Sequence, residues 1–136
     1  MGFKENFDIY KERAVKLKDE LLTEEATKTA LIMPFFSLLG YDVFNPNEFV
    51  PEYISDIGTK KGEKIDYAIV KNGEPLILIE AKKAGMKLQK QQQYQLMRYF
   101  GVSKSRIAIL TNGISYQFFS DMESPNLMDD EPFFLF

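Results

Sequence analysis

Two apolar segments, Lys64–Val70 and Leu76–Lys82, carry charged side chains within sequences that otherwise fit buried strands. Asp66 interrupts the first segment. Glu80 and Lys82 interrupt the second and lie two residues apart, so a strand would present both on one face. A charge inside a core-like strand is costly unless it is paired or binds a metal ion. The fold must therefore supply partners for these charges, and this is the strongest constraint that the sequence sets.

Composition limits the chemistry that these charges can perform. The chain has 136 residues, enough for one domain with a real core, and we expect residues 1–136 to form that single domain. It contains neither cysteine nor histidine. This excludes disulfides, zinc sites of the usual type, and Ser-His or cysteine nucleophiles. Any metal ion must be held by oxygen atoms, which indicates Mg²⁺, Mn²⁺ or Ca²⁺.

The chain shows no sign of membrane insertion or export. The apolar run 30–39 is too short to span a bilayer and contains Pro34 and Ser37. The N-terminal residues Lys4, Glu5 and Asp8 do not fit a signal peptide. We therefore expect a cytoplasmic protein.

Hydrophobic periodicity predicts an α/β fold with the element order α-α-β-β-β-α-β-β and a mixed sheet flanked by helices. The expected helices lie within residues 1–22, 23–39 and 86–100. The expected strands lie within residues 41–53, 65–70, 76–81, 106–110 and 114–119. The connection from the 76–81 strand through a helix to the 106–110 strand should be a right-handed parallel crossover.

Local signals refine these boundaries. Thr23 is expected to cap the second helix, Gly40 to end it and Pro34 to kink it. Pro51 predicts that the first strand lies at a sheet edge. Thr111-Asn112-Gly113 predicts a hairpin. Residues 121–136 are expected to form an irregular acidic tail with an apolar end, which continues into a longer chain or packs on a partner.

The loop between the two charged strands decides whether Asp66 and Glu80 meet. A two-residue turn at Asn72-Gly73 would pair Val70 with Pro75 and turn Asp66 away from Glu80. A five-residue loop over 71–75 would place Asp66 opposite Glu80, where Cβ atoms are about 4.5–5.5 Å apart. The longer loop also keeps Pro75, which lacks an N–H, out of the ladder. We expect the five-residue loop.

Two carboxylates and one ammonium at strand ends are the functional groups that a metal-dependent nuclease uses. We expect Asp66 and Glu80 to bind Mg²⁺, with Mn²⁺ as a substitute, together with the carbonyl of Ala81. Lys82 would orient the attacking water and neutralise the charge that develops on phosphorus. The structural alternative is a salt-bridge cluster at a strand end. Glu24 or Glu25 is a possible third carboxylate, and a first-turn dipole complement is the alternative role of this pair.

Charge is segregated along the chain in a way that suits a phosphate-binding surface. Residues 59–106 contain 11 Lys and Arg against 4 Asp and Glu, whereas the remainder contains 6 against 16. The alternative is a solvated lysine-rich face. Gln95 and Tyr99, four apart on one helix, either border the phosphate path or form an ordinary half-buried face. The expected DNA-binding residues are Lys60, Lys61, Lys83, Lys87, Gln95 and Tyr99.

The ordered set of motifs resembles the PD-(D/E)xK nuclease superfamily, and more narrowly the N-terminal domain of type I restriction enzyme R subunits. The matching pieces are Glu24–Thr27, Leu31–Pro34, Leu39–Tyr41, Glu63–Tyr67, Ile79–Lys83, Gln95–Phe100 and Thr111–Gly113. Ile65 stands where the superfamily motif has proline. The resemblance implies a restriction-endonuclease-like core and a catalytic set of Asp66, Glu80 and Lys82, assisted by Glu24.

The same resemblance implies a Mg²⁺-dependent DNA endonuclease domain that works with a motor or specificity subunit of a restriction complex. It also implies that Gln95 and Tyr99 lie near the DNA path. The chain itself carries no ATPase signature. Two further possibilities remain open from the residues alone. One is a catalytically silent module of nuclease fold that binds DNA or a partner protein, and the other is an interaction domain that docks through its apolar tail.

Overall fold

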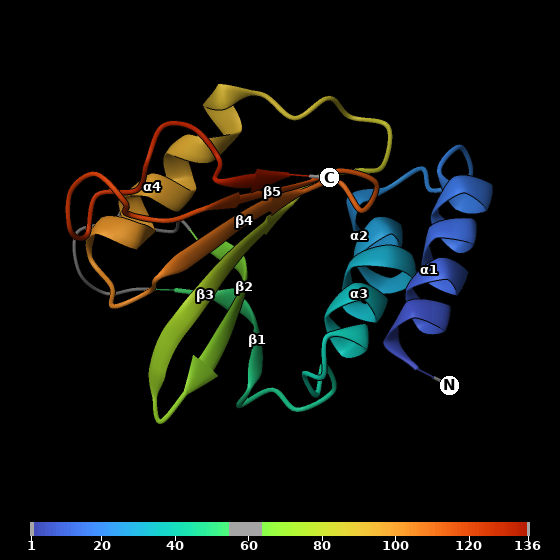
Figure 1. Cartoon of the computed structure of the whole chain (residues 1–136), viewed down its shortest axis with the longest axis horizontal. Helices are drawn as coiled ribbons and strands as arrows, with labels where there is room; N and C mark the ends of the chain where they lie inside the picture. The colour runs from blue at the N-terminus through green and yellow to red at the C-terminus, as the bar shows by residue number, and fades with distance from the viewer. Residues whose placement is uncertain (1, 55–63, 136) are drawn as a thin grey trace.

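The computed structural model describes residues 2–54 and 64–135, and it contains one six-stranded sheet between two helical layers (Figure 1). The strands are β1 (Phe49–Tyr53), β2 (Ile65–Lys71), β3 (Glu74–Ala81), β4 (Ile107–Thr111), β5 (Tyr116–Phe119) and β6 (Phe134–Leu135). They lie in chain order across the sheet. β3 and β4 are parallel and all other neighbours are antiparallel, so the predicted mixed sheet, parallel crossover and β1 edge are confirmed.

The helices are α1 (Phe3–Leu17), α2 (Glu24–Thr27), a π-helical segment η1 (Lys28–Ile32), α3 (Met33–Leu38), a short 3₁₀ turn η2 (Lys90–Gln93) and α4 (Tyr94–Gly101). Figure 1 shows α1, α2 and α3 on one side of the sheet and α4 on the other. Two apolar cores follow from this arrangement. One packs Leu31, Phe35 and Phe36 against one face of the sheet, and the other packs Leu96 and Phe100 against the opposite face.

The second helical segment begins as predicted and differs from the prediction at its centre. The Thr23 hydroxyl accepts a 3.0 Å hydrogen bond from the Ala26 N–H and so caps α2. Pro34 cannot donate to the carbonyl of Ala30. A π-helical turn ends two residues before this proline, in place of a simple kink, and the Met33 N–H donates to the Lys28 carbonyl. The extra residue in this turn changes the direction in which the side chains of η1 point.

The β2–β3 hairpin corrects the loop prediction. The turn has two residues, Asn72 and Gly73, and both have positive φ, as an Asn-Gly type I′ turn requires. Val70 therefore pairs with Pro75. Its N–H points to the Glu48 carbonyl at 2.9 Å, on the β1 side, so the missing N–H of Pro75 removes no bond between β2 and β3.

A β-bulge then restores the register that the site needs. Ile69 pairs with Ile77, so Leu76 is the extra residue of β3, and the register continues to Tyr67 opposite Ile79. One step further along, Asp66 lies beside Glu80. The predicted loop length was wrong, but the predicted neighbourhood of the two carboxylates is confirmed because the bulge compensates for the shorter turn.

Two further elements differ from the sequence prediction. The helix expected over 86–100 is confined to η2 and α4, and residues 82–89 form an extended connection instead. The expected irregular tail contains β6, which pairs with β5 through Phe134 opposite Phe118. Its two residues are too few for a period-2 pattern, so sequence periodicity could not reveal it. Among the described residues, none of the helices has the length and apolarity required to cross a membrane.

Gly113, in the β4–β5 turn, packs closely against the helical layer. Its φ is +83°, and an added Cβ would lie 3.0 Å from the Leu31 side chain and 3.1 Å from Thr27 Cγ2. Gly73 has a similar φ of +77° with open space around it. We expect Gly113→Ala to lower the free energy of unfolding by about 1–3 kcal/mol more than Gly73→Ala, because only the former adds overpacking to backbone strain. Urea denaturation of both variants measures the difference, and equal losses would contradict this packing.

Candidate functional site

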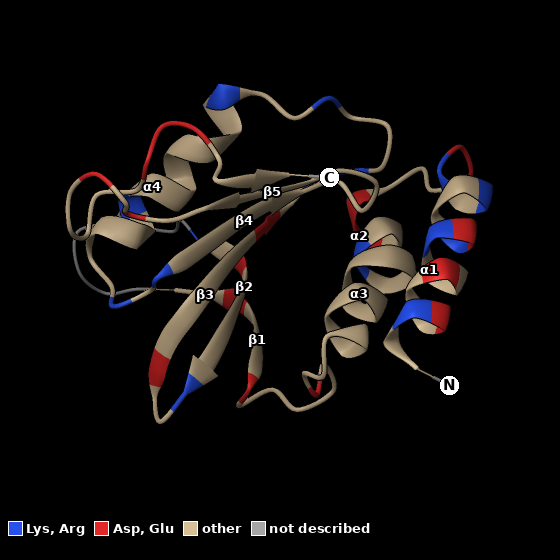
Figure 2. Ribbon diagram, in the orientation of Figure 1, with Lys and Arg blue, Asp and Glu red and all other residues tan. Residues whose placement is uncertain are grey.

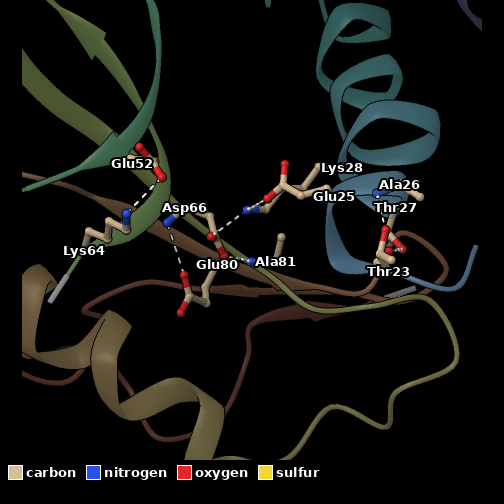
Figure 3. A network of polar contacts seen from close by, with 10 residues as sticks. All are labelled: Thr23, Glu25, Ala26, Thr27, Lys28, Glu52, Lys64, Asp66, Glu80 and Ala81. Atoms are coloured by element: carbon tan, nitrogen blue, oxygen red, sulfur yellow. Dashed lines mark hydrogen bonds and ion pairs between the residues drawn. The ribbon is translucent and has the colours of Figure 1, made fainter.

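Asp66 and Glu80 interlock at the ends of β2 and β3 (Figure 3). The Asp66 N–H donates to Glu80 Oε1 at 3.2 Å, and the Ala81 N–H donates to Asp66 Oδ2 at 2.8 Å. Each carboxylate thus accepts a bond from the backbone of the other strand. These reciprocal bonds fix both carboxyl groups side by side, as the sequence predicted.

Glu80 is the more deeply buried of the two acids, with 5% of its surface exposed. Burial, followed by the nearby charge of Asp66 and a hydrogen bond with it, raises the pKa of the Glu80 carboxyl to about 8, and Lys82 offsets only part of this effect. A buried carboxyl with a raised pKa beside a second carboxylate favours either a proton or a cation at this point.

Lys28 of η1 supplies a cation that the sequence analysis did not identify. Its Nζ lies 2.8 Å from Asp66 Oδ1 and 3.1 Å from Glu25 Oε1. Its side chain is 11% exposed, and the ammonium lies 5.8 Å from the centre of the Tyr67 ring. Burial acts to lower the pKa of Lys28, but hydrogen bonds and charge from Asp66 and Glu25 outweigh it, so the pKa is raised overall. Lys28 is therefore charged, and it belongs with Glu25, Asp66, Glu80 and Lys82 to one cluster of ionisable side chains.

Lys82 lies next to Glu80 but makes a looser contact. Its Nζ is 3.9 Å from Glu80 Oε2, and its side chain is 24% exposed. Its backbone is held more firmly, because the Lys82 N–H donates to the Thr111 carbonyl of the parallel strand β4 at 2.8 Å. The ammonium can thus move while the backbone below it stays fixed.

Two hydrogen bonds anchor the first half of the connection formed by residues 82–89. The Ala84 N–H donates to Thr27 Oγ1 at 2.9 Å, and Asn112 Nδ2 donates to the Met86 carbonyl at 2.8 Å. Three of its residues, Lys82, Lys83 and Lys87, are basic and none is acidic (Figure 2). Lys87 is exposed and Lys83 is half-buried. The segment that continues the chain from Glu80 is therefore basic.

The other predicted site residues lie in different settings. Glu24 is half-buried at the start of α2, and within residues 2–54 and 64–135 no ion pair joins it to the cluster, whereas Glu25 contacts Lys28. Gln95 donates from Nε2 to the Lys64 carbonyl and so ties α4 to the start of β2. Tyr99 is fully buried in the core under α4. Lys60 and Lys61 lie outside the described residues.

These positions favour a structural role for Gln95 and Tyr99. Since Tyr99 exposes no surface, its ring cannot contact DNA in this conformation. Sequence reasoning missed Lys28 and Thr27 because their partners, Asp66 and Ala84, are 38 and 57 residues away. The only local signal was the three-residue spacing of Glu25 and Lys28, which suits an ion pair on a helix.

The donor set suits a hard divalent cation. The candidate ligands are carboxylate and carbonyl oxygens, which Mg²⁺ and Mn²⁺ prefer. Among the residues described, no group of three or more acidic, histidine or cysteine side chains surrounds one point. Two carboxylates are nevertheless sufficient for Mg²⁺, which keeps several of its waters and uses few protein ligands.

A mixed sheet with helices on both faces, and with Asp, Glu and Lys together at the ends of adjacent strands, has the architecture of a restriction-endonuclease-like α/β core. The family model described as the type I restriction enzyme R protein N terminus matches residues 23–130. The chain therefore belongs to this family, with which placement in the PD-(D/E)xK superfamily is consistent. Searches of curated proteins and of solved structures gave no match.

The buried Glu80 carboxyl predicts how stability depends on pH. Its folded-state pKa of about 8 lies above the ordinary value of 4.5, so the folded protein holds a proton that the unfolded chain releases between these pH values. Without metal ions, the free energy of unfolding should therefore fall by about 2–4 kcal/mol as pH rises from 4.5 to 8. Urea denaturation at several pH values measures this slope.

Glu80→Gln mimics the protonated carboxyl and should flatten most of the slope. Glu20→Gln, which changes an exposed acid beyond α1, is the matched control and should leave the slope in place. An unchanged slope in Glu80→Gln would show that protonation of Glu80 does not cause the pH dependence of the free energy of unfolding.

Proposed function

We propose that this domain is a Mg²⁺-dependent DNA endonuclease that hydrolyses phosphodiester bonds, with Mn²⁺ as an alternative metal ion. The observation that carries the proposal is the interlocked pair Asp66 and Glu80, with the ammonium of Lys82 beside it. A purely structural ion pair does not require a second carboxylate beside the first. Two adjacent carboxylates create a site of negative charge whose natural occupant is a divalent cation.

Asp66 and Glu80 would hold the metal ion, and the carbonyl of Ala81 would be a further oxygen ligand. When bound, the ion supplies Lewis-acid polarisation of the phosphate and lowers the pKa of a coordinated water. The bond from the Ala81 N–H fixes the orientation of the Asp66 carboxylate before any ion arrives. The site is therefore preorganised by backbone groups, which cannot rotate away as side chains can.

Lys82 would act on the reacting phosphate. Its Nζ lies 3.9 Å from Glu80 Oε2, on a backbone held by the bond to the Thr111 carbonyl. From this position an ammonium can orient the attacking water and neutralise charge that develops on the phosphate oxygens. Glu24 or Glu25 would assist from α2, and Glu25 would do so indirectly, through its contact with Lys28.

DNA would be bound through its backbone rather than its base edges. Lys83 and Lys87 follow Lys82 in the basic connection, so this segment would offer positive charge to phosphates that approach the two carboxylates. Lys60 and Lys61 would contribute further positive charge for the DNA backbone. Membership in the R-protein family supports action within a restriction complex, where a motor or specificity subunit would deliver the DNA.

One observation favours a second candidate function. The ion pair of Lys28 with Asp66 already neutralises one carboxylate, as a salt-bridge cluster in a catalytically silent DNA-binding module would. The two candidates differ in their requirement for metal. A silent module would bind DNA equally with and without Mg²⁺ and would cut none.

Nicking of supercoiled plasmid by the purified domain, in Mg²⁺ and in Mn²⁺, tests the proposed activity. We expect metal-dependent nicking, and Lys82→Ala should reduce its rate by about 100-fold or more, because an electrostatic contact to the transition state is lost. Lys71→Ala is the matched control, since it removes an exposed lysine at the far end of β2. It should nick at the wild-type rate.

Other outcomes would count against the proposal. Nicking that survives Lys82→Ala unchanged would indicate a contaminating nuclease or a wrong assignment of Lys82. Absence of nicking with both metal ions, together with metal-independent DNA binding in a gel-shift assay, would favour the silent module.

A further inference from the structure

Lys28 contacts an Asp66 oxygen that the proposed metal ion would need. Of the two Asp66 oxygens, Oδ2 accepts the Ala81 N–H, and Oδ1 lies 2.8 Å from the Lys28 ammonium. At Glu80, Oε1 accepts the Asp66 N–H and Oε2 lies 3.9 Å from Lys82. Every carboxylate oxygen of the pair thus has a partner. The two backbone partners are fixed, and only the two ammonium groups can leave.

The helical layer directs Lys28 into this position. Lys28 begins the π-helical segment η1, whose wider turn precedes Pro34. The residue before it, Thr27, is fully buried and is tied to the connection after Lys82 by the 2.9 Å bond from the Ala84 N–H. The Lys28 backbone therefore cannot shift easily, and its side chain crosses from the helical layer to the end of β2 (Figure 3).

The Glu25 carboxylate is a second acceptor for the Lys28 ammonium. Asp66 is 20% exposed, whereas Glu25 is 82% exposed and lies toward solvent. If Lys28 leaves Asp66, its ammonium can keep the contact with Glu25 and gain water. An ammonium and a divalent cation on the same carboxylate repel each other, so the two cannot occupy Asp66 Oδ1 together.

We propose that Lys28 is a resident cation of the metal site, which neutralises Asp66 in the empty protein and competes with the divalent ion for it. Glu25 keeps its contact with the displaced ammonium and so stabilises it away from Asp66. This inference rests on the proposed function, because it takes the Asp66–Glu80 pair to be the metal site. It assigns Lys28 and Glu25 the role of setting metal affinity, and neither residue binds the metal itself.

Titration with Mn²⁺, followed by electron paramagnetic resonance of the free ion, tests the competition in the absence of DNA. Lys28→Met removes the charge and keeps the aliphatic stem. We expect it to bind Mn²⁺ at least tenfold more tightly than wild type. Glu25→Ala should bind more weakly than wild type, because the displaced ammonium loses its acceptor. In the Lys28→Met background, Glu25→Ala should change the affinity much less.

The double-mutant comparison separates this role from direct ligation. If Glu25 bound the metal, its removal would weaken Mn²⁺ binding equally in both backgrounds, and the proposed role of Glu25 would be wrong. Unchanged or weaker Mn²⁺ binding by Lys28→Met, with binding abolished by Asp66→Asn, would overturn the competition and leave the metal site intact. Absence of Mn²⁺ binding in every variant would overturn both this inference and the metal dependence of the proposed function.

A second measurement uses the wild-type protein and so does not depend on the folding of a variant. Acylation of lysines by a water-soluble ester, read by mass spectrometry, reports the accessibility of each ammonium. We expect Lys28 to react slowly without metal and severalfold faster in saturating Mn²⁺. Lys16, exposed on α1, is the internal reference and should not change. Equal reactivity of Lys28 in both conditions would overturn the displacement.

Discussion

Burial of the Glu80 carboxyl is the constraint around which the end of the sheet is arranged. A buried acid requires hydrogen bonds and a neutralising charge, and each of its neighbours contributes one of these. The Asp66 N–H supplies a hydrogen bond, and Lys82 supplies charge from the surface side. Asp66 adds a second negative charge, which Lys28 then balances from the helical layer. Each carboxyl group of the pair thus has a lysine beside it, Lys28 at Asp66 and Lys82 at Glu80.

The rest of the fold maintains this arrangement from a distance. The bulge at Leu76 sets the register of β2 and β3, and the parallel pairing with β4 fixes the backbone of Lys82. Thr27 and Asn112 hold the connection that follows. Gln95 ties α4 to Lys64, two residues before Asp66. Residues that look like ordinary polar positions in the sequence therefore act by positioning the acids.

Sequence reasoning succeeded where the signal is local. The Thr23 cap, the order of the first five strands, the parallel crossover and the meeting of Asp66 with Glu80 all follow from periodicity and residue type. It failed where tertiary geometry decides. The absence of an N–H in Pro75 argued for a longer loop, but an Asn-Gly turn with a bulge solves the same problem. Lys28 could not be identified, because a helical lysine looks alike whether it meets solvent or a carboxylate far along the chain.

The proposed function depends on a divalent-cation centre between β2 and β3. A crystal structure of the domain grown with Mn²⁺, with diffraction recorded at the manganese absorption edge, tests this claim most directly. We predict an anomalous peak bonded to one oxygen of Asp66 and one of Glu80, with the Lys28 ammonium withdrawn toward Glu25. A map without a peak at these carboxylates at saturating Mn²⁺, with Lys28 still on Asp66, would contradict it.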